Sequence, residues 1–111
     1  MKTDLELLTL AAKAAGLRIR RHIAGFVHID SDGLDAGRWS PLTNDGDAFR
    51  LAVKLNICTL LPSRDSVGRR VGAGEVGSTG PAFFEPYAPH PFAAMRRAIV
   101  RAAAQIGEAM P

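Results

Sequence analysis

A glycine-rich segment carries the most recognisable chemical motif of this sequence. Gly72, Gly74 and Gly77 match the spacing G-x-G-x-x-G, and Arg69 and Arg70 stand just before them. A dinucleotide site needs a helix that starts within this motif, and the Ser-Thr-Gly-Pro sequence that follows cannot start one. The lysine of a P-loop is absent as well. Two interpretations remain: a loop whose backbone N–H groups and arginines hold a phosphate, or a glycine loop that binds nothing.

Aromatic side chains form a second group of candidates for binding. Phe83, Phe84 and Tyr87 stand in a stretch rich in glycine and proline, at about residues 63–91. They either pack as a lid over the core or form a binding face. Trp39 is the only tryptophan, and it either seats the following helix on a sheet or is an exposed anchor for a ligand or partner.

Metal and nucleophilic chemistry find little support in the residue spacing. The segment Asp30–Asp35 resembles part of a calcium loop, but no glutamate follows at the required distance. His22, His28 and His90 are not spaced as a metal-binding pair on one helix, and Cys58 stands in an apolar strand, as a small core residue does. We therefore predict no metal site, no cofactor and no enzymatic activity.

Basic residues gather toward the two ends of the sequence. Residues 1–24 hold five basic and two acidic side chains, residues 25–91 six and eight, and residues 92–111 three and one. Five arginines could form one basic surface: Arg18, Arg20, Arg96, Arg97 and Arg101. That surface would contact phosphates or an acidic protein; the alternative is a solvated face without a partner.

Composition bounds the class of protein. With 111 residues and 47% hydrophobic residues, the chain is the size of one globular domain, residues 1–111, with the stretch 63–91 as an irregular insertion. One cysteine excludes an intramolecular disulfide. No apolar run is long enough for a membrane span, and the first residues do not form a signal peptide. These features predict a cytoplasmic location.

Periodicity predicts an α+β domain in which three helices pack on a small, mainly antiparallel sheet, in the order α-β-β-α-β-(β)-α. Thr3 and Glu6 form a capping box, and Thr43 or Asn44 caps the second helix. The expected helices are 4–15, one that ends at Asn56, and 91–108. The expected strands are 17–23, 26–29, 57–61 and 70–76, with a polar loop at 30–38. Two apolar helix faces are expected to be buried: Ala48, Phe49, Ala52, Val53 and Leu55 on the second helix, and Phe92, Met95, Ile99, Ala102, Ala103 and Ile106 on the third.

Two segments are distinctive, Trp39–Leu55 and Arg96–Ala103. Together they resemble small phage and prophage proteins with the "phage ABA sandwich" domain, in which a W-x-P segment opens a helix and a helix of the R-A-I-V type closes the chain. The likeness covers most of residues 5–108, although the stretch 63–91 is longer than the hairpin of that family. The resemblance implies helices packed around a sheet and no established enzyme activity.

The resemblance, together with these features, implies an accessory protein of a phage or prophage that acts by binding in the cytoplasm of a bacterial host cell. Its partner would be a host protein, met by Trp39 and the aromatic stretch, or a small anionic, nucleotide-like ligand trapped by a homo-oligomer. The alternative is a nucleic-acid-binding protein that uses the basic terminal segments.

Overall fold

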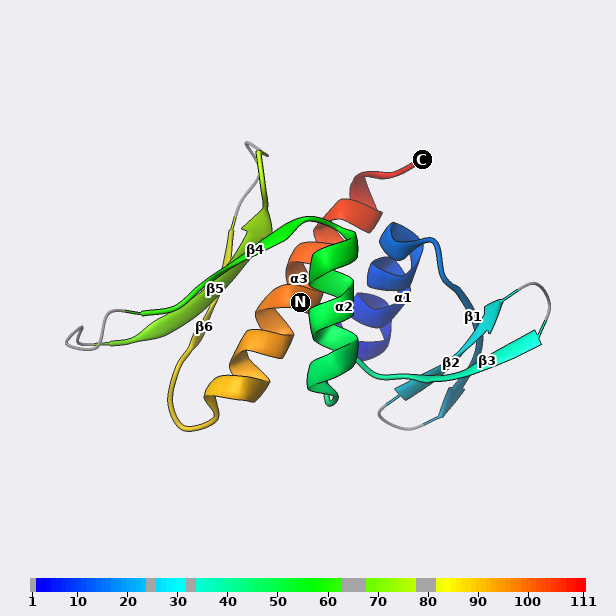
Figure 1. Ribbon diagram of the computed structural model, residues 1–111, viewed down its shortest axis with the longest axis horizontal. Coiled ribbons are helices and arrows are strands. Elements are labelled where there is room, and N and C mark those ends of the chain that lie inside the picture. The colour runs from blue at the N-terminus through cyan, green and yellow to red at the C-terminus, as the bar shows by residue number, and fades with distance from the viewer. Residues whose placement is uncertain (1, 24–25, 32–33, 63–67, 78–81) are drawn as a thin grey trace.

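The computed structural model describes residues 2–23, 26–31, 34–62, 68–77 and 82–111. Three helices form a central layer, and a three-stranded sheet lies on each side of it (Figure 1). The molecule measures 49 × 29 × 25 Å along its principal axes. The helices therefore separate two sheets that present different surfaces.

Nine elements follow one another along the described chain: α1 (Asp4–Ala15), β1 (Arg18–Ile23), β2 (Phe26–Ser31), β3 (Leu34–Trp39), α2 (Asp45–Lys54), β4 (Ile57–Leu60), β5 (Arg70–Glu75), β6 (Phe83–Pro86) and α3 (Pro91–Ala109). All strand pairs are antiparallel, in the spatial orders β1-β2-β3 and β4-β5-β6.

Local sequence signals set the ends of the helices. The hydroxyl oxygen of Thr3 accepts a hydrogen bond from the N–H of Glu6 at 3.1 Å, and Gly16, with φ of 73°, ends α1. The side-chain oxygen of Asn44 accepts from the N–H of Asp47 at 2.8 Å and begins α2. Pro91 occupies the first turn of α3, where its missing N–H has no consequence.

The cap of α2 gives a prediction about stability. Replacing Asn44 by alanine removes the acceptor for the N–H of Asp47 and is expected to lower the free energy of unfolding by about 1 kcal/mol. Urea denaturation of Asn44→Ala measures the change. Lys54→Ala, an exposed substitution on the same helix, is the control, and equal destabilisation by both variants would contradict the role of the cap.

The core lies mainly where α1 and α3 cross. Small side chains let the two helix backbones approach closely: Ala11, Ala12, Ala15, Ala98, Ala102, Ala103 and Ala104 are all buried. The approach is closest at Gly107, where a Cβ atom would stand 2.0 Å from the carbonyl oxygen of Leu10. A glycine is therefore required at this crossing.

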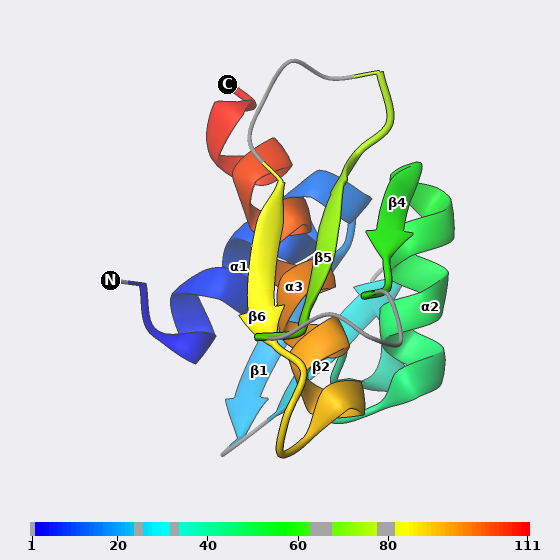
Figure 2. The same ribbon diagram turned by 90° about the vertical axis from the view of Figure 1, so that its left-hand side faces the viewer.

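The sheet β4-β5-β6 packs on the helical layer. Figure 2 looks onto this sheet: β5 and β6 lie over α3, and α2 extends past the outer edge of β4. The inward side chains Val71 and Ala73 of the central strand are fully buried. Because the sheet ends at β4, it leaves part of α2 without a covering strand.

The predicted α+β class and element order are confirmed. The three helices lie within one or two residues of the expected bounds. Two segments expected as loops are strands instead. Residues expected as the polar loop 30–38 contribute to β2 and β3, and the stretch 63–91 contains β6 as well as β5. Pairing with a neighbouring strand stabilises these segments, and the residue pattern alone does not show that pairing.

Candidate functional site

Most of the glycine motif lies in a strand, as expected for residues 70–76, and this position does not favour the interpretation as a phosphate-binding loop. Gly72 and Gly74 belong to the central strand β5, where they pair with Leu60 and Cys58 of β4. The N–H of Val76 donates to the carbonyl oxygen of Asn56 at 2.9 Å. Because hydrogen-bonded pairs alternate along an antiparallel ladder, the N–H groups of both glycines point to β4 and do not face a ligand.

The two strand glycines make room for neighbouring side chains. A Cβ atom at Gly72 would lie 2.6 Å from Cε1 of Phe84, so the ring of Phe84 occupies the place of a side chain. Gly77, with φ of 77°, follows β5 in a turn. The spacing G-x-G-x-x-G therefore reflects strand packing and a turn.

A substitution at Gly72 tests its packing role beside Phe84. Alanine usually stabilises a strand relative to glycine, but Gly72→Ala is expected to cost about 1–2 kcal/mol because its methyl group meets the ring of Phe84. In a Phe84→Ala background most of this cost should disappear, which a double-mutant cycle by denaturant unfolding measures. An equal cost in both backgrounds would refute the packing role.

Arginine side chains cover the predicted aromatic residues. The guanidinium carbon of Arg69 lies 4.2 Å from the ring centre of Tyr87, and that of Arg70 lies 5.4 Å from Phe84. The guanidinium carbon of Arg101 lies 4.9 Å from the ring centre of Phe83. These are cation–π contacts within the sheet and between the sheet and α3. The structure thus brings the predicted aromatic residues and arginines together, as packing partners of one another.

The arginines of α3 are paired with acidic side chains. Arg96 contacts Asp45 at 2.6 Å and donates from Nε to the carbonyl oxygen of Leu42 at 2.9 Å. Arg97 contacts Asp4 at 3.0 Å. Because each of these charges already has a partner, they are poorly suited to bind nucleic-acid phosphates.

The five predicted arginines do not form one surface. Arg101 contacts Glu85 of β6, whereas Arg18 and Arg20 are exposed on β1. The sheets that contain β1 and β6 lie on opposite sides of the helical layer (Figure 1). The structure therefore does not bring Arg18 and Arg20 together with Arg101 on one surface.

The structure decides between the two interpretations of Trp39 and corrects the environment expected for Cys58. Trp39 is only 6% exposed and belongs to the hydrophobic core, so it is unsuited to be an exposed anchor and serves packing. Cys58, expected in the core, is exposed on β4. Its side chain points to the outer face of the sheet, because neighbouring Ile57 points inward and is buried.

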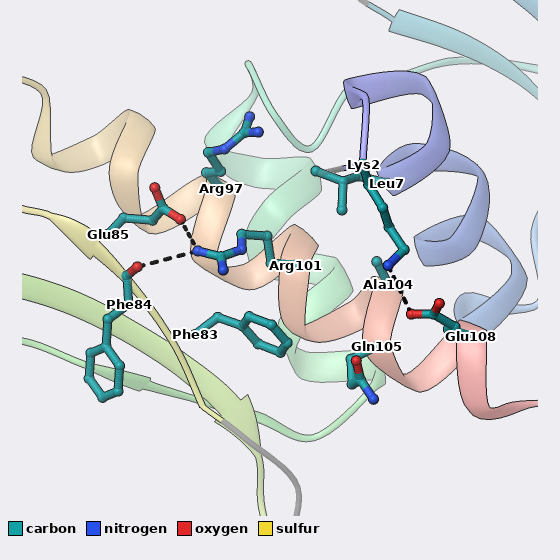
Figure 3. A pocket seen from close by; sticks show the side chains of 10 residues that line it. All are labelled: Lys2, Leu7, Phe83, Phe84, Glu85, Arg97, Arg101, Ala104, Gln105 and Glu108. Atoms are coloured by element: carbon teal, nitrogen blue, oxygen red, sulfur yellow. Dashed lines mark hydrogen bonds and ion pairs between the residues drawn. The ribbon is translucent and has the colours of Figure 1, made fainter.

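A first groove lies between β6, α3 and the N-terminal segment, with a volume of about 460 Å³ (Figure 3). Its cations point toward acidic groups: Lys2 contacts Glu108 at 3.1 Å, and Arg101 contacts Glu85 and the carbonyl oxygen of Phe84. An anionic ligand would have to displace these carboxylates. The groove therefore favours a structural role for its charges.

A second groove, the β4 groove, lies between α2, the first half of α3 and β4. Two hollows of about 320 and 280 Å³ share Phe49, Thr59 and Ile99 and join into one depression. Its lining is mainly apolar, with Phe49, Val53, Phe92, Met95 and Ile99, and its polar members are Asn56, Thr59 and the ion pair of Asp45 with Arg96. Phe49, Val53 and Phe92 are 68%, 65% and 74% exposed. So much exposed apolar surface at one place is typical of an interaction site.

The outer edge of β4 borders the β4 groove and is open. β4 pairs with β5 on one side, and no described strand pairs with its other side. Along an antiparallel strand, residues alternate between hydrogen bonding to the partner strand and facing away from it. Cys58 and Leu60 form the hydrogen-bonded pairs with β5, so the backbone N–H and C=O groups of Ile57 and Thr59 point outward. These groups are available to another chain.

The opposite edge of the same sheet is blocked. Arg101 donates to the carbonyl oxygen of Phe84 at 3.3 Å, Pro86 has no N–H, and Glu85 adds a charge. Charged side chains and prolines at an edge prevent pairing with another chain. β4 has no charge, no proline and no shift in register. The two edges therefore differ in charge and in proline, two features that control strand addition.

Sequence reasoning placed the groove residues in the core. Phe49 and Val53 were expected on the buried face of α2, and Phe92 on that of α3, and both expectations are wrong. One signal was present: the apolar residues of α2 span an arc wider than the single stripe that a helix buries. The part of that arc around Phe49 and Val53 faces the groove.

Comparison with family models found no match, and no curated protein or solved structure is similar to this chain. The resemblance to phage proteins therefore stays a prediction.

Within the described ranges, no three His, Cys, Asp or Glu residues come together as metal ligands. None of the described helices is long and apolar enough to cross a membrane. Of the calcium-loop segment, residues 32–33 lie outside the described residues.

Proposed function

We propose that this protein acts by binding another protein, and that the β4 groove is the binding surface. The observation that carries the proposal is the concentration of exposed apolar side chains around the groove, led by Phe49, Val53 and Phe92. Interface centres are rich in aromatic and apolar residues that enter pockets of the partner or receive its side chains. A host protein, as the sequence predicted, is a partner of this kind.

The apolar lining favours a protein over the other candidate partners. Nucleic acid needs unpaired cations to replace its counterions, and the described arginines of α3 are held by Asp4, Asp45 and Glu85. A small anionic ligand would meet the same obstacle in the first groove. Burial of the exposed side chains of the β4 groove, in contrast, gains free energy without breaking any ion pair.

Photo-crosslinking at the groove tests this function. A photoreactive phenylalanine analogue at position 49 should form an adduct with a distinct protein in host cells. The same analogue at Leu5, which is exposed on α1 outside the groove, is the control and should give no such adduct. Identical adducts from both positions, or none from position 49, would refute the groove as the binding surface.

A further inference from the structure

The sheet beside the β4 groove lacks a strand at the place where α2 is uncovered. Strands in a sheet lie about 4.8 Å apart, and α2 extends past the edge of β4 (Figure 2). One more strand beside β4 would lie over α2. Its inward side chains would contact Phe49 and Val53, which are now largely exposed.

From this geometry we infer that the partner binds as an extended segment that pairs with β4 and adds a fourth strand to the sheet. This inference rests on the proposed function and specifies how the partner binds to the β4 groove. The outward N–H and C=O groups of Ile57 and Thr59 form the main-chain hydrogen bonds, as in other cases of strand addition. Side chains on one face of the segment enter the groove, so every second residue of the segment is apolar.

Charge indicates the residues that flank the apolar core of this segment. Lys54 is exposed in the last turn of α2, beside the Ile57 end of the open edge. Arg50 is exposed one helical turn earlier, although Asp47 contacts it at 2.7 Å. An acidic residue at the end of the added strand complements this rim. The segment recognised is therefore an extended, alternating peptide with an acidic residue at the end that meets this rim.

A synthetic peptide provides the probe: valine and threonine alternate, and glutamates close both ends. Amide hydrogen exchange of the full chain is measured by NMR with and without the peptide. We expect exchange at Ile57 and Thr59 to slow by at least about tenfold, because strand pairing protects these two N–H groups. A matched peptide with N-methylated backbone amides should not bind, because its pairing groups are blocked.

A pair of variants at one position separates strand pairing from groove filling. Thr59→Pro removes an N–H that faces outward, and every hydrogen bond of the β4–β5 ladder is kept. It should weaken peptide binding by at least about tenfold, whereas Thr59→Val keeps the N–H and the shape of the side chain and should weaken binding far less than Thr59→Pro. Thermal unfolding checks that both variants fold.

The outcomes distinguish this inference from the proposed function. Peptide binding that is insensitive to Thr59→Pro and to N-methylation would overturn strand addition, and the adduct at position 49 would still support the groove. No protection at Ile57 and Thr59 at saturating peptide would overturn strand addition as well. The N–H groups of Ile57 and Thr59 could also be protected without peptide, to a degree that grows with protein concentration. That result would assign the edge to a second copy of this chain and would overturn the inference that a partner segment pairs with β4.

Discussion

Gly107→Ala is expected to lower the free energy of unfolding by about 3 kcal/mol, the upper range for an overpacked core. The added methyl carbon would stand 2.0 Å from the carbonyl oxygen of Leu10 and 2.8 Å from its carbonyl carbon. Backbone atoms cannot rotate away as a flexible side chain does. The variant therefore has to separate α1 from α3, which carry most of the buried alanines.

Chemical denaturation of Gly107→Ala and of a control on the same helix measures this effect. Gln105 is exposed on α3, so Gln105→Ala should change the stability by no more than about 0.5 kcal/mol. Because alanine is a better helix former than glycine by about 1 kcal/mol, propensity alone would make Gly107→Ala stabilising. A stability equal to or above that of the natural protein would contradict the close helix crossing.

Phe49→Asp is expected to reduce the affinity for the partner captured at position 49 by at least about thirtyfold. This factor corresponds to about 2 kcal/mol, the usual threshold for an energetically dominant interface residue. The carboxylate would be buried against Met95 and Ile99 in the bound state, and Arg96, the cation of the groove lining, is already paired with Asp45. In the free protein the side chain at position 49 is 68% exposed, so the stability should change by only about 0.5 kcal/mol.

Titration calorimetry with the purified partner measures the affinity of Phe49→Asp. Leu5→Asp is the matched control, since it places the same charge at an exposed apolar position of α1. An unchanged affinity of Phe49→Asp would show that the aromatic side chain does not contribute to binding. A similar loss in both variants would indicate a general effect of charge and not a groove contact.

Local signals made most of the fold predictable. Thr3, Gly16 and Asn44 act through neighbouring backbone groups, so the ends of α1 and the start of α2 follow from a few adjacent residues. The strand β6 and the strand position of Gly72 depend on pairing between segments distant in sequence. Such pairing has no signature in local spacing, so β6 was expected as a loop, and the strand expected at 70–76 was expected without its partner strands.

The candidate site was harder to predict than the fold. A helix with apolar residues at positions 48, 49, 52, 53 and 55 is expected to bury a wide face, but the sheet that would cover Phe49 and Val53 ends at β4. The arginines of α3 illustrate the converse. Their number suggested a basic surface, but acidic residues from three other elements or their caps neutralise them.

The most direct test of the central claim is a map of backbone amide chemical shifts on addition of the purified partner. If the β4 groove is the binding surface, the largest changes will occur at Phe49, Val53, Thr59 and Ile99, with α1 and β1 unaffected. Changes that instead cluster on β1, at Arg18 and Arg20, or on the first groove near Arg101 and Gln105, would contradict the account.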